Sequence, residues 1–216
     1  MITDSGGFQI FSLAYGSVHE ELSQESELKK QKHRFRTSHD RSQAVKVSEK
    51  GVVFRSYRNG QKILLTPESS VQCQKSLGAD IIIPLDELPP YHIDRNVLSD
   101  SVDRTHRWEA RSLIEHLKDV KQQAMYAVIH GGIDTEFRTR SVNYLTSLPF
   151  DGYAIGGSLG KNHDELMSLL SWMMPMFDAK HRQSKPRHLL GIADEKNILG
   201  SIPHGIDTFD SVSHKP

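Results

Sequence analysis

Short apolar runs alternate with stretches of helical periodicity along most of this chain, and few folds accept that pattern. Continuous apolar runs predict strands that are buried on both faces, and they occupy 80–85, 124–129, 152–155 and 188–190. Apolar residues at helical spacing predict helices over 101–120, 137–148 and 162–177. Strands that alternate with helices favour a parallel sheet with right-handed crossovers.

The earlier part of the chain carries turn and capping signals. Asn59-Gly60 between the apolar runs 52–54 and 62–65 predicts a β-hairpin, because both residues tolerate the positive φ of a tight turn. Thr66 is placed to cap a helix that ends near Gly78. Residues 17–49 are charge-dense and poor in apolar residues, so they are interpreted as a polar, solvated insertion.

Polar residues and glycines follow the predicted strands: Asp4, Asp86, His130, Gly157, Gly191 and Asp210. A (β/α)8 barrel builds its active site from the residues at these strand ends. With a first strand at Met1-Ile2 and a last one within 205–209, six strands are counted where a barrel has eight. We therefore predict one α/β domain over 1–216, an incomplete (β/α)8 TIM barrel. The chain enters its first strand with no lead-in and stops soon after its last, so truncation at both ends is expected.

Composition sets broad limits on function. Lys plus Arg and Asp plus Glu each number 27 in 216 residues, so a nucleic acid would have to bind a local basic patch. The single cysteine, Cys73, cannot form an internal disulfide or a cysteine-rich metal site. No signal peptide or membrane span is recognised, and a cytoplasmic location is expected.

Six motifs together resemble one enzyme family. They are Asp4-Ser-Gly-Gly-Phe-Gln9, Asp86-Glu87, His130-Gly-Gly132, Tyr153-Ala-Ile-Gly-Gly157, Leu189-Leu-Gly191 and Gly205-Ile-Asp-Thr-Phe-Asp210. In this order and spacing the chain resembles the tRNA-guanine transglycosylases, also called queuine tRNA-ribosyltransferases, over nearly its whole length outside 17–49. The resemblance implies exchange of guanine at tRNA wobble position 34, within a GUN anticodon, for queuine or its precursor 7-aminomethyl-7-deazaguanine.

The resemblance also implies roles for particular residues. Asp210 would be the nucleophile that forms a covalent ribosyl-enzyme, and Asp4 the general acid and base. Asp86 would accept from the base, and Phe8 would stack on it. The expected substrate-binding set is Asp4, Ser5, Gly6, Gly7, Phe8, Asp86, His130, Gly156 and Gly157. The expected RNA-binding set is Gly191, Ile192, Ala193, Asp194, Glu195, Lys196 and Asn197.

The chain departs from the family pattern around the expected base pocket and at its end. Leu88 stands where the bacterial enzymes have Cys and His130 where they have Gln, and the loop after Gly157 is one residue shorter. These changes predict a shifted preference among deazaguanine bases, toward the bulkier queuine. The family's structural zinc and its Cys/His subdomain have no counterpart here, so no metal or cofactor is expected within these residues. A homodimer without membrane contact is implied.

Other interpretations remain for the chain and for its residues. The chain could be an inactive fragment or a non-catalytic partner subunit of such an enzyme. Asp4 could belong to an ordinary Asx-turn, Asp86-Glu87 could cap a helix, and His130 could be structural. A six-stranded sheet leaves two edges unpaired, so the isolated chain is expected to fold poorly and to exchange guanine weakly or not at all.

Overall fold

The structure is a computed structural model that describes residues 1–15, 45–56, 58–178 and 185–211. Its centre is a six-stranded sheet in the order β1-β5-β6-β7-β8-β9, in which every pair of neighbours is parallel. The strands are β1 (Ile2–Thr3), β5 (Ile81–Ile82), β6 (Ala124–Ile129), β7 (Gly152–Ile155), β8 (Arg187–Leu189) and β9 (Thr208–Phe209). All six predicted strands are therefore present, and the prediction of an incomplete barrel of the (β/α)8 type is confirmed.

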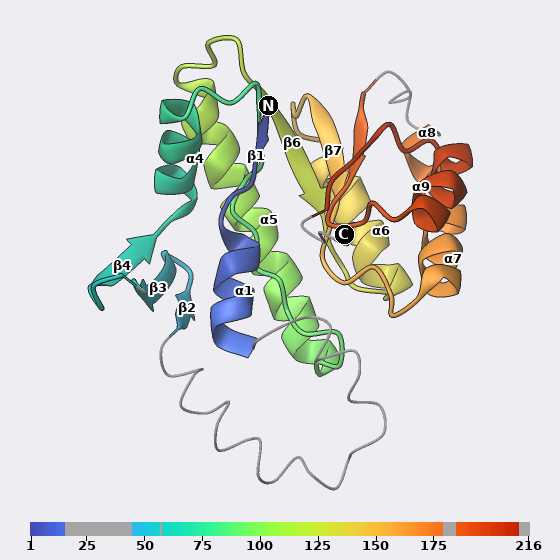
Figure 1. The fold of residues 1–216 in the computed structure, drawn as a ribbon, viewed down its shortest axis with the longest axis horizontal. Helices are drawn as coiled ribbons and strands as arrows, with labels where there is room; N and C mark the ends of the chain where they lie inside the picture. The colour runs from blue at the N-terminus through green and yellow to red at the C-terminus, as the bar shows by residue number, and fades with distance from the viewer. Residues whose placement is uncertain (16–44, 57, 179–184, 212–216) are drawn as a thin grey trace, which may run out of the picture.

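Helices connect successive strands of this sheet (Figure 1). They are α1 (Gly7–Tyr15), α4 (Pro67–Ser76), α5 (Arg95–Leu117), α6 (Thr135–Leu145), α7 (His163–Met173), α8 (Pro175–Asp178), α9 (Glu195–Ser201) and the 3-10 helix η2 (Ile202–His204). Helices α4 and α5 pack together beside β5 and β6, and α8 and α9 lie against α7. Among the described helices, none combines the length and the apolarity that a membrane span requires.

The main core lies between the sheet and the helices that follow it. The apolar stripe predicted for the helix after β7 is buried, with Leu166, Leu169, Leu170 and Met173 packed on residues of β6 to β8. Asn162 caps this helix, because its side chain accepts a hydrogen bond from the Glu165 N–H. Capping and burial thus fix α7 at the place that the sequence pattern predicts.

The predicted hairpin is present, but it belongs to a larger sheet. Strands β3 (Gly51–Arg55) and β4 (Lys62–Leu65) pair antiparallel, and β2 (Lys46–Ser48) adds a third strand. The interpretation of 17–49 as a solvated insertion is therefore wrong at its end, where Val45 and Val47 pack against a buried cluster that includes Trp108. Two alternating valines are too weak a signal in a charged segment. Residues 17–44 lie outside the described residues.

Three further boundaries differ from the predictions. Helix α5 begins at Arg95, six residues before the predicted start, because Asp94 caps it through the Asn96 N–H. Helix α1 was not predicted, since its buried residues fill little more than one turn. The strand predicted over 80–85 pairs only at 81–82 because the side chain of Gln74 bonds both the N–H and the carbonyl of Ile83.

Burial within α7 gives a first prediction. Leu170 is fully buried in the main core, so Leu170→Ala removes apolar contact and leaves a cavity. The free energy of unfolding is expected to fall by about 2–5 kcal/mol. Leu199→Ala on the nearby α9 is the control, because Leu199 is 62% exposed, and it should change the value by about 0.5 kcal/mol or less. Urea unfolding of the two variants measures both, and equal effects would contradict the assigned packing.

Candidate active site

The residues that follow the six strands meet at one edge of the sheet. Asp4 follows β1, His130 follows β6, and Asp210 follows β9, while Asp86 lies a few residues beyond β5. Parallel strands direct their carboxyl ends to the same edge, so tertiary structure brings together residues that are up to about two hundred positions apart. The charges of Asp86 and Asp210 both act on Asp4, which places the three acids within electrostatic reach of one another.

Ser5 connects two of these acids. Its N–H donates to Asp4 Oδ1 at 2.8 Å, and its hydroxyl donates to Asp86 Oδ1 at 3.2 Å. Its own carbonyl accepts from the buried Ser70 hydroxyl at 2.8 Å, which anchors it to α4. A Cβ atom on Gly7 would lie 2.4 Å from Asp86 Oδ1, so only glycine permits this approach of α1 to Asp86. The Asp-Ser-Gly-Gly motif therefore holds Asp4 and Asp86 in a fixed relation.

Asp4 takes up protons more readily than an ordinary aspartate. The pKa of Asp4 is raised from 3.8 to about 6 in total. Burial is the largest cause, the negative charge of Asp86 is the next, and the charge of Asp210 contributes less. The Ser5 N–H opposes part of the rise because it stabilises the carboxylate. Asp4 nevertheless remains open to solvent on one side. It can thus gain and lose a proton near neutral pH, as a general acid and base must.

Asp210 has the opposite character. Burial alone would raise its pKa, but hydrogen bonds from His188 and from the Gly191 N–H outweigh burial and hold the pKa of Asp210 below 3.8. His188 Nε2 lies 3.1 Å and the Gly191 N–H 2.8 Å from the same oxygen, Oδ1. Oδ2 has no hydrogen-bond partner among the described residues. Asp210 is therefore ionised at neutral pH and presents one free oxygen.

His188 belongs to the candidate site, and the sequence analysis missed it. It is buried on β8, and its Nδ1 lies 2.8 Å from the Thr208 hydroxyl while its Nε2 meets Asp210. If the Thr208 hydroxyl donates to Nδ1, Nε2 carries the proton that Asp210 accepts. The only sequence signal was a histidine at the start of the short run predicted as a strand over 188–190. A buried histidine is more often structural, so this signal alone does not identify it.

His130 and the two glycines after β7 form the next part of the site. His130 is buried, and its Nε2 lies 3.0 Å from Asp86 Oδ2 without the alignment of a hydrogen bond. Gly157 has a φ of +72°, and a Cβ there would lie 3.0 Å from His130 Nδ1. A Cβ on Gly156 would instead meet Val128 and Leu190. Gly157 therefore permits the close approach to His130, whereas Gly156 is required by packing between strands.

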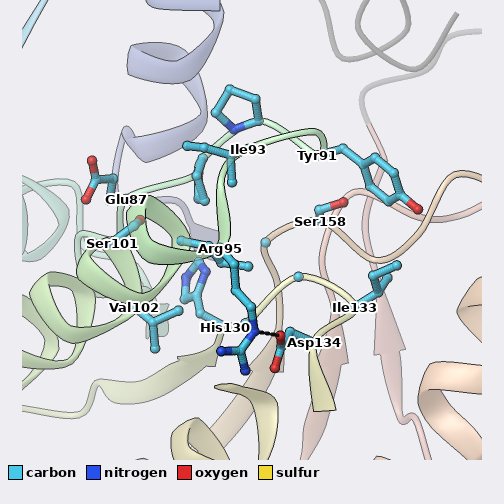
Figure 2. A pocket seen from close by; sticks show the side chains of 16 residues that line it. Glu87, Tyr91, Ile93, Arg95, Ser101, Val102, His130, Ile133, Asp134 and Ser158 are labelled. Carbon is cyan, nitrogen blue, oxygen red and sulfur yellow. Dashed lines mark hydrogen bonds and ion pairs between the residues drawn. The ribbon is translucent and has the colours of Figure 1, made fainter. Parts of the chain in front are cut away.

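A cavity of about 380 Å³ opens beyond His130 (Figure 2). Figure 2 shows Tyr91, Ile93 and Ser158 around it, with Arg95 bound to Asp134 at its floor. Asp4, Asp86 and Asp210 do not line it. The acids instead lie at the carboxyl edge of the sheet, here called the mouth, and Asp86 lies beside His130, which lines the cavity.

The remaining predicted residues are less closely tied to the acids. Phe8 lies in the first turn of α1, is 43% exposed, and stacks on Phe11. In the predicted RNA-binding set, Asp194 caps α9 and accepts from both the backbone and the side chain of Asn197. Gly191 supports Asp210 through its N–H. Structural roles thus account for several members of 191–197, while Glu195 and Lys196 are exposed.

The described residues do not provide a metal site. No group of three or more His, Cys, Asp or Glu residues among them has an arrangement that could hold a metal ion. Cys73 is exposed on α4.

Comparison with known proteins identifies the family of the chain. A sequence model described as queuine tRNA-ribosyltransferase matches residues 35–215. The chain belongs to this family. Proteins named queuine tRNA-ribosyltransferase are 57% identical in Protochlamydia amoebophila and 50% identical in Chlamydia pneumoniae, each over 211 residues and 98% of this chain. The alignments cover 51% and 53% of those relatives, so the chain spans about half their length.

The unequal acids give a second prediction. The Asp4 carboxyl is expected to titrate near pH 6, and Asp86→Asn should lower this midpoint because it removes a neighbouring negative charge. Carbon-13 NMR titration of labelled aspartate carboxyls measures both values. Asp151→Asn is the control, since Asp151 bonds the Met125 N–H and does not contribute to the shift of Asp4. A midpoint near 4 in the parent protein would contradict the assigned environment.

Proposed function

We propose that this chain carries the catalytic centre of a transferase that exchanges guanine at the tRNA wobble position for a 7-deazaguanine base. The observation that carries the proposal is the opposite shift in pKa of two acids in one mouth, Asp4 upward and Asp210 downward. A pair of acids whose pKa values are pushed apart suits a proton donor beside an ionised nucleophile. Family membership supplies the substrate class.

In the proposed first step, Asp210 attacks the ribose anomeric carbon through its free oxygen. A bond forms between Oδ2 and this carbon, and the bond to guanine breaks with its electron pair on the base. Asp4, protonated in a fraction of molecules near neutral pH, gives its proton to the leaving guanine. His188 and the Gly191 N–H hold the other oxygen of Asp210, which fixes the orientation of the carboxylate.

The second step reverses the first with a different base. Asp4, now ionised, takes a proton from the incoming deazaguanine, which attacks the anomeric carbon and releases Asp210. Two displacements preserve the anomeric configuration and leave the RNA backbone uncut. Asp210 loses its negative charge while it is bonded to ribose. This loss lowers the pKa of Asp4 and favours its ionised form at the stage when Asp4 must accept a proton.

Asp86 and His130 are proposed to read the base. Asp86 accepts from the Ser5 hydroxyl and lies beside His130 Nε2, a buried atom with no aligned partner. A buried polar atom left without a hydrogen bond is costly, so a ligand atom that satisfies it gains free energy. The adjacent N1–H and N2–H donors of guanine match one carboxylate, and a carbonyl on the same ring would match His130 as a donor.

The transferase proposal includes tRNA, the base and a possible homodimer as partners of the whole protein. The alternative is a non-catalytic subunit or an inactive fragment, and the length of the relatives is compatible with it. The retained Asp4, Asp210 and their supporting hydrogen bonds favour catalysis. Incorporation of labelled guanine into tRNA separates the two interpretations.

Substitution of the two acids gives the third prediction. Asp210→Asn should abolish the covalent adduct with tRNA, because an amide is a poor nucleophile. Asp4→Asn should still form the adduct slowly but turn over poorly, since a group that moves a proton fails at a different step. Denaturing gels with labelled tRNA distinguish the two variants. An undiminished adduct in Asp210→Asn would show that another residue is the nucleophile.

Base choice gives the fourth prediction. The cavity beyond His130 is lined by Ser158, Ile133 and Tyr91 and offers space for a large 7-substituent next to the proposed position of the base. We expect queuine to be preferred over the aminomethyl precursor by roughly tens to a hundredfold, which corresponds to about 1–3 kcal/mol. Competition between the two bases, with guanine as the reference, measures the ratio. A strong preference for the precursor would contradict this use of the cavity.

A further inference from the structure

Arg138 is the most deeply buried cation of the described structure, and it lies behind the walls of the cavity. Arg138 lies on α6, and its side chain is 0% exposed. Among the described residues, no carboxylate pairs with it. Burial lowers the pKa of Arg138 from 12.5 to about 9, so the guanidinium is still charged at neutral pH. A buried charge without a counter-ion is costly unless several hydrogen bonds compensate for it.

The guanidinium of Arg138 donates to three backbone carbonyls, at the end of β6 and in the loops after β6 and β7. Nη1 and Nε donate to the carbonyls of Ile129 and Gly132, which flank His130 and Gly131 after β6. Nη2 donates at 2.8 Å to the carbonyl of Ser158, in the loop after β7. The carbonyl of Ile129 also accepts from the Gly156 N–H, so one point joins α6 to both strands.

These loops form much of the cavity wall. Gly131, Gly132, Gly157 and Ser158 line the cavity together with His130. A Cβ on Gly131 would lie 2.6 Å from the backbone nitrogen of Arg138, so this loop is packed directly on α6. The planar guanidinium has its donors in fixed directions and therefore sets the distance between the loops.

We propose that Arg138 is a positioning residue that sets the width of the cavity beyond His130 and thereby selects the 7-substituent of the base. The inference rests on the proposed base exchange. Guanine has no 7-substituent, so its exchange depends on the acids and on His130 but little on the far wall. Exchange of a base that carries a 7-substituent depends on the acids and His130 and also on the far wall of the cavity. Disturbing Arg138 should therefore change the ratio between bases more than it changes the exchange of guanine.

The test uses the whole protein with Arg138→Lys and Arg138→Met. Lysine keeps the charge, but its ammonium lacks the planar set of donors that reaches all three carbonyls. Methionine removes the charge and keeps an apolar side chain. The ratio of kcat/KM for queuine over guanine is expected to fall about tenfold or more in both variants, mainly through KM for the base. KM for tRNA should stay within about twofold.

Arg140→Lys is the matched control. Arg140 lies on the same helix, is partly exposed, and pairs with Asp103 on α5 and not with the loops. Its substitution should leave the ratio between bases unchanged. Hydrogen exchange gives a readout that is independent of activity, since Arg138→Lys should speed exchange in 129–132 and 156–160 but not in α7.

The outcomes separate this inference from the proposed function. Equal loss for guanine and queuine, with faster hydrogen exchange throughout the protein, would mean that Arg138 only stabilises the fold. If Arg138→Lys changes neither the queuine-to-guanine ratio of kcat/KM nor hydrogen exchange in the two loops, the inference is also overturned. If the unsubstituted protein exchanges no base at all, the proposed function fails, while hydrogen exchange in the two loops still tests whether Arg138 holds them.

Discussion

Parallel pairing of β1 with β5, and of each later strand with the next, is the constraint on which the candidate site depends. It directs every strand in the same sense, so the residues that follow β1, β6 and β9 arrive at one edge. The register is supported by side chains as well as by the ladder. Gln74 bonds Thr3 and both backbone groups of Ile83, which continues the alignment of β1 and β5 beyond their two paired residues.

Two acids of the same residue type acquire opposite properties at this edge because burial, neighbouring charges and hydrogen-bond donors act on them differently. Asp4 is buried near two other carboxylates and receives one backbone donor, so burial and repulsion outweigh the donor and its protonated form is favoured. Asp210 receives a histidine and a backbone donor on one oxygen, so its ionised form is favoured. His188 on β8 and Gly191, which follows β8, supply the donors that lower the pKa of Asp210, whereas the single donor from Ser5 does not offset the burial of Asp4. Catalytic roles can thus be assigned from the environment and not from the residue type.

Buried polar groups behind the mouth hold its walls in place. Arg138 links the loops after β6 and β7 through carbonyls. The buried Ser141 hydroxyl accepts from the His130 N–H and hydrogen-bonds His106 Nε2 at 3.1 Å. Burial lowers the pKa of His106 to about 3, so that ring stays neutral at the pH where the site would work. Such networks restrict the positions of loops more strongly than apolar packing, because each unsatisfied group would be costly.

The sequence by itself determined the strands, most helices and the positions of the acids, because these depend on local periodicity, capping residues and motif order. Thr66 caps a helix as its place in the sequence predicts. Only the tertiary structure decided that Gln74 would replace a strand partner, that Val45 and Val47 would extend the hairpin, and that His188 would support Asp210. These contacts join residues from separate elements, and local sequence patterns carry no information about such distances. The split in pKa between Asp4 and Asp210 has the same origin, since it arises from burial and from neighbours that only folding brings together.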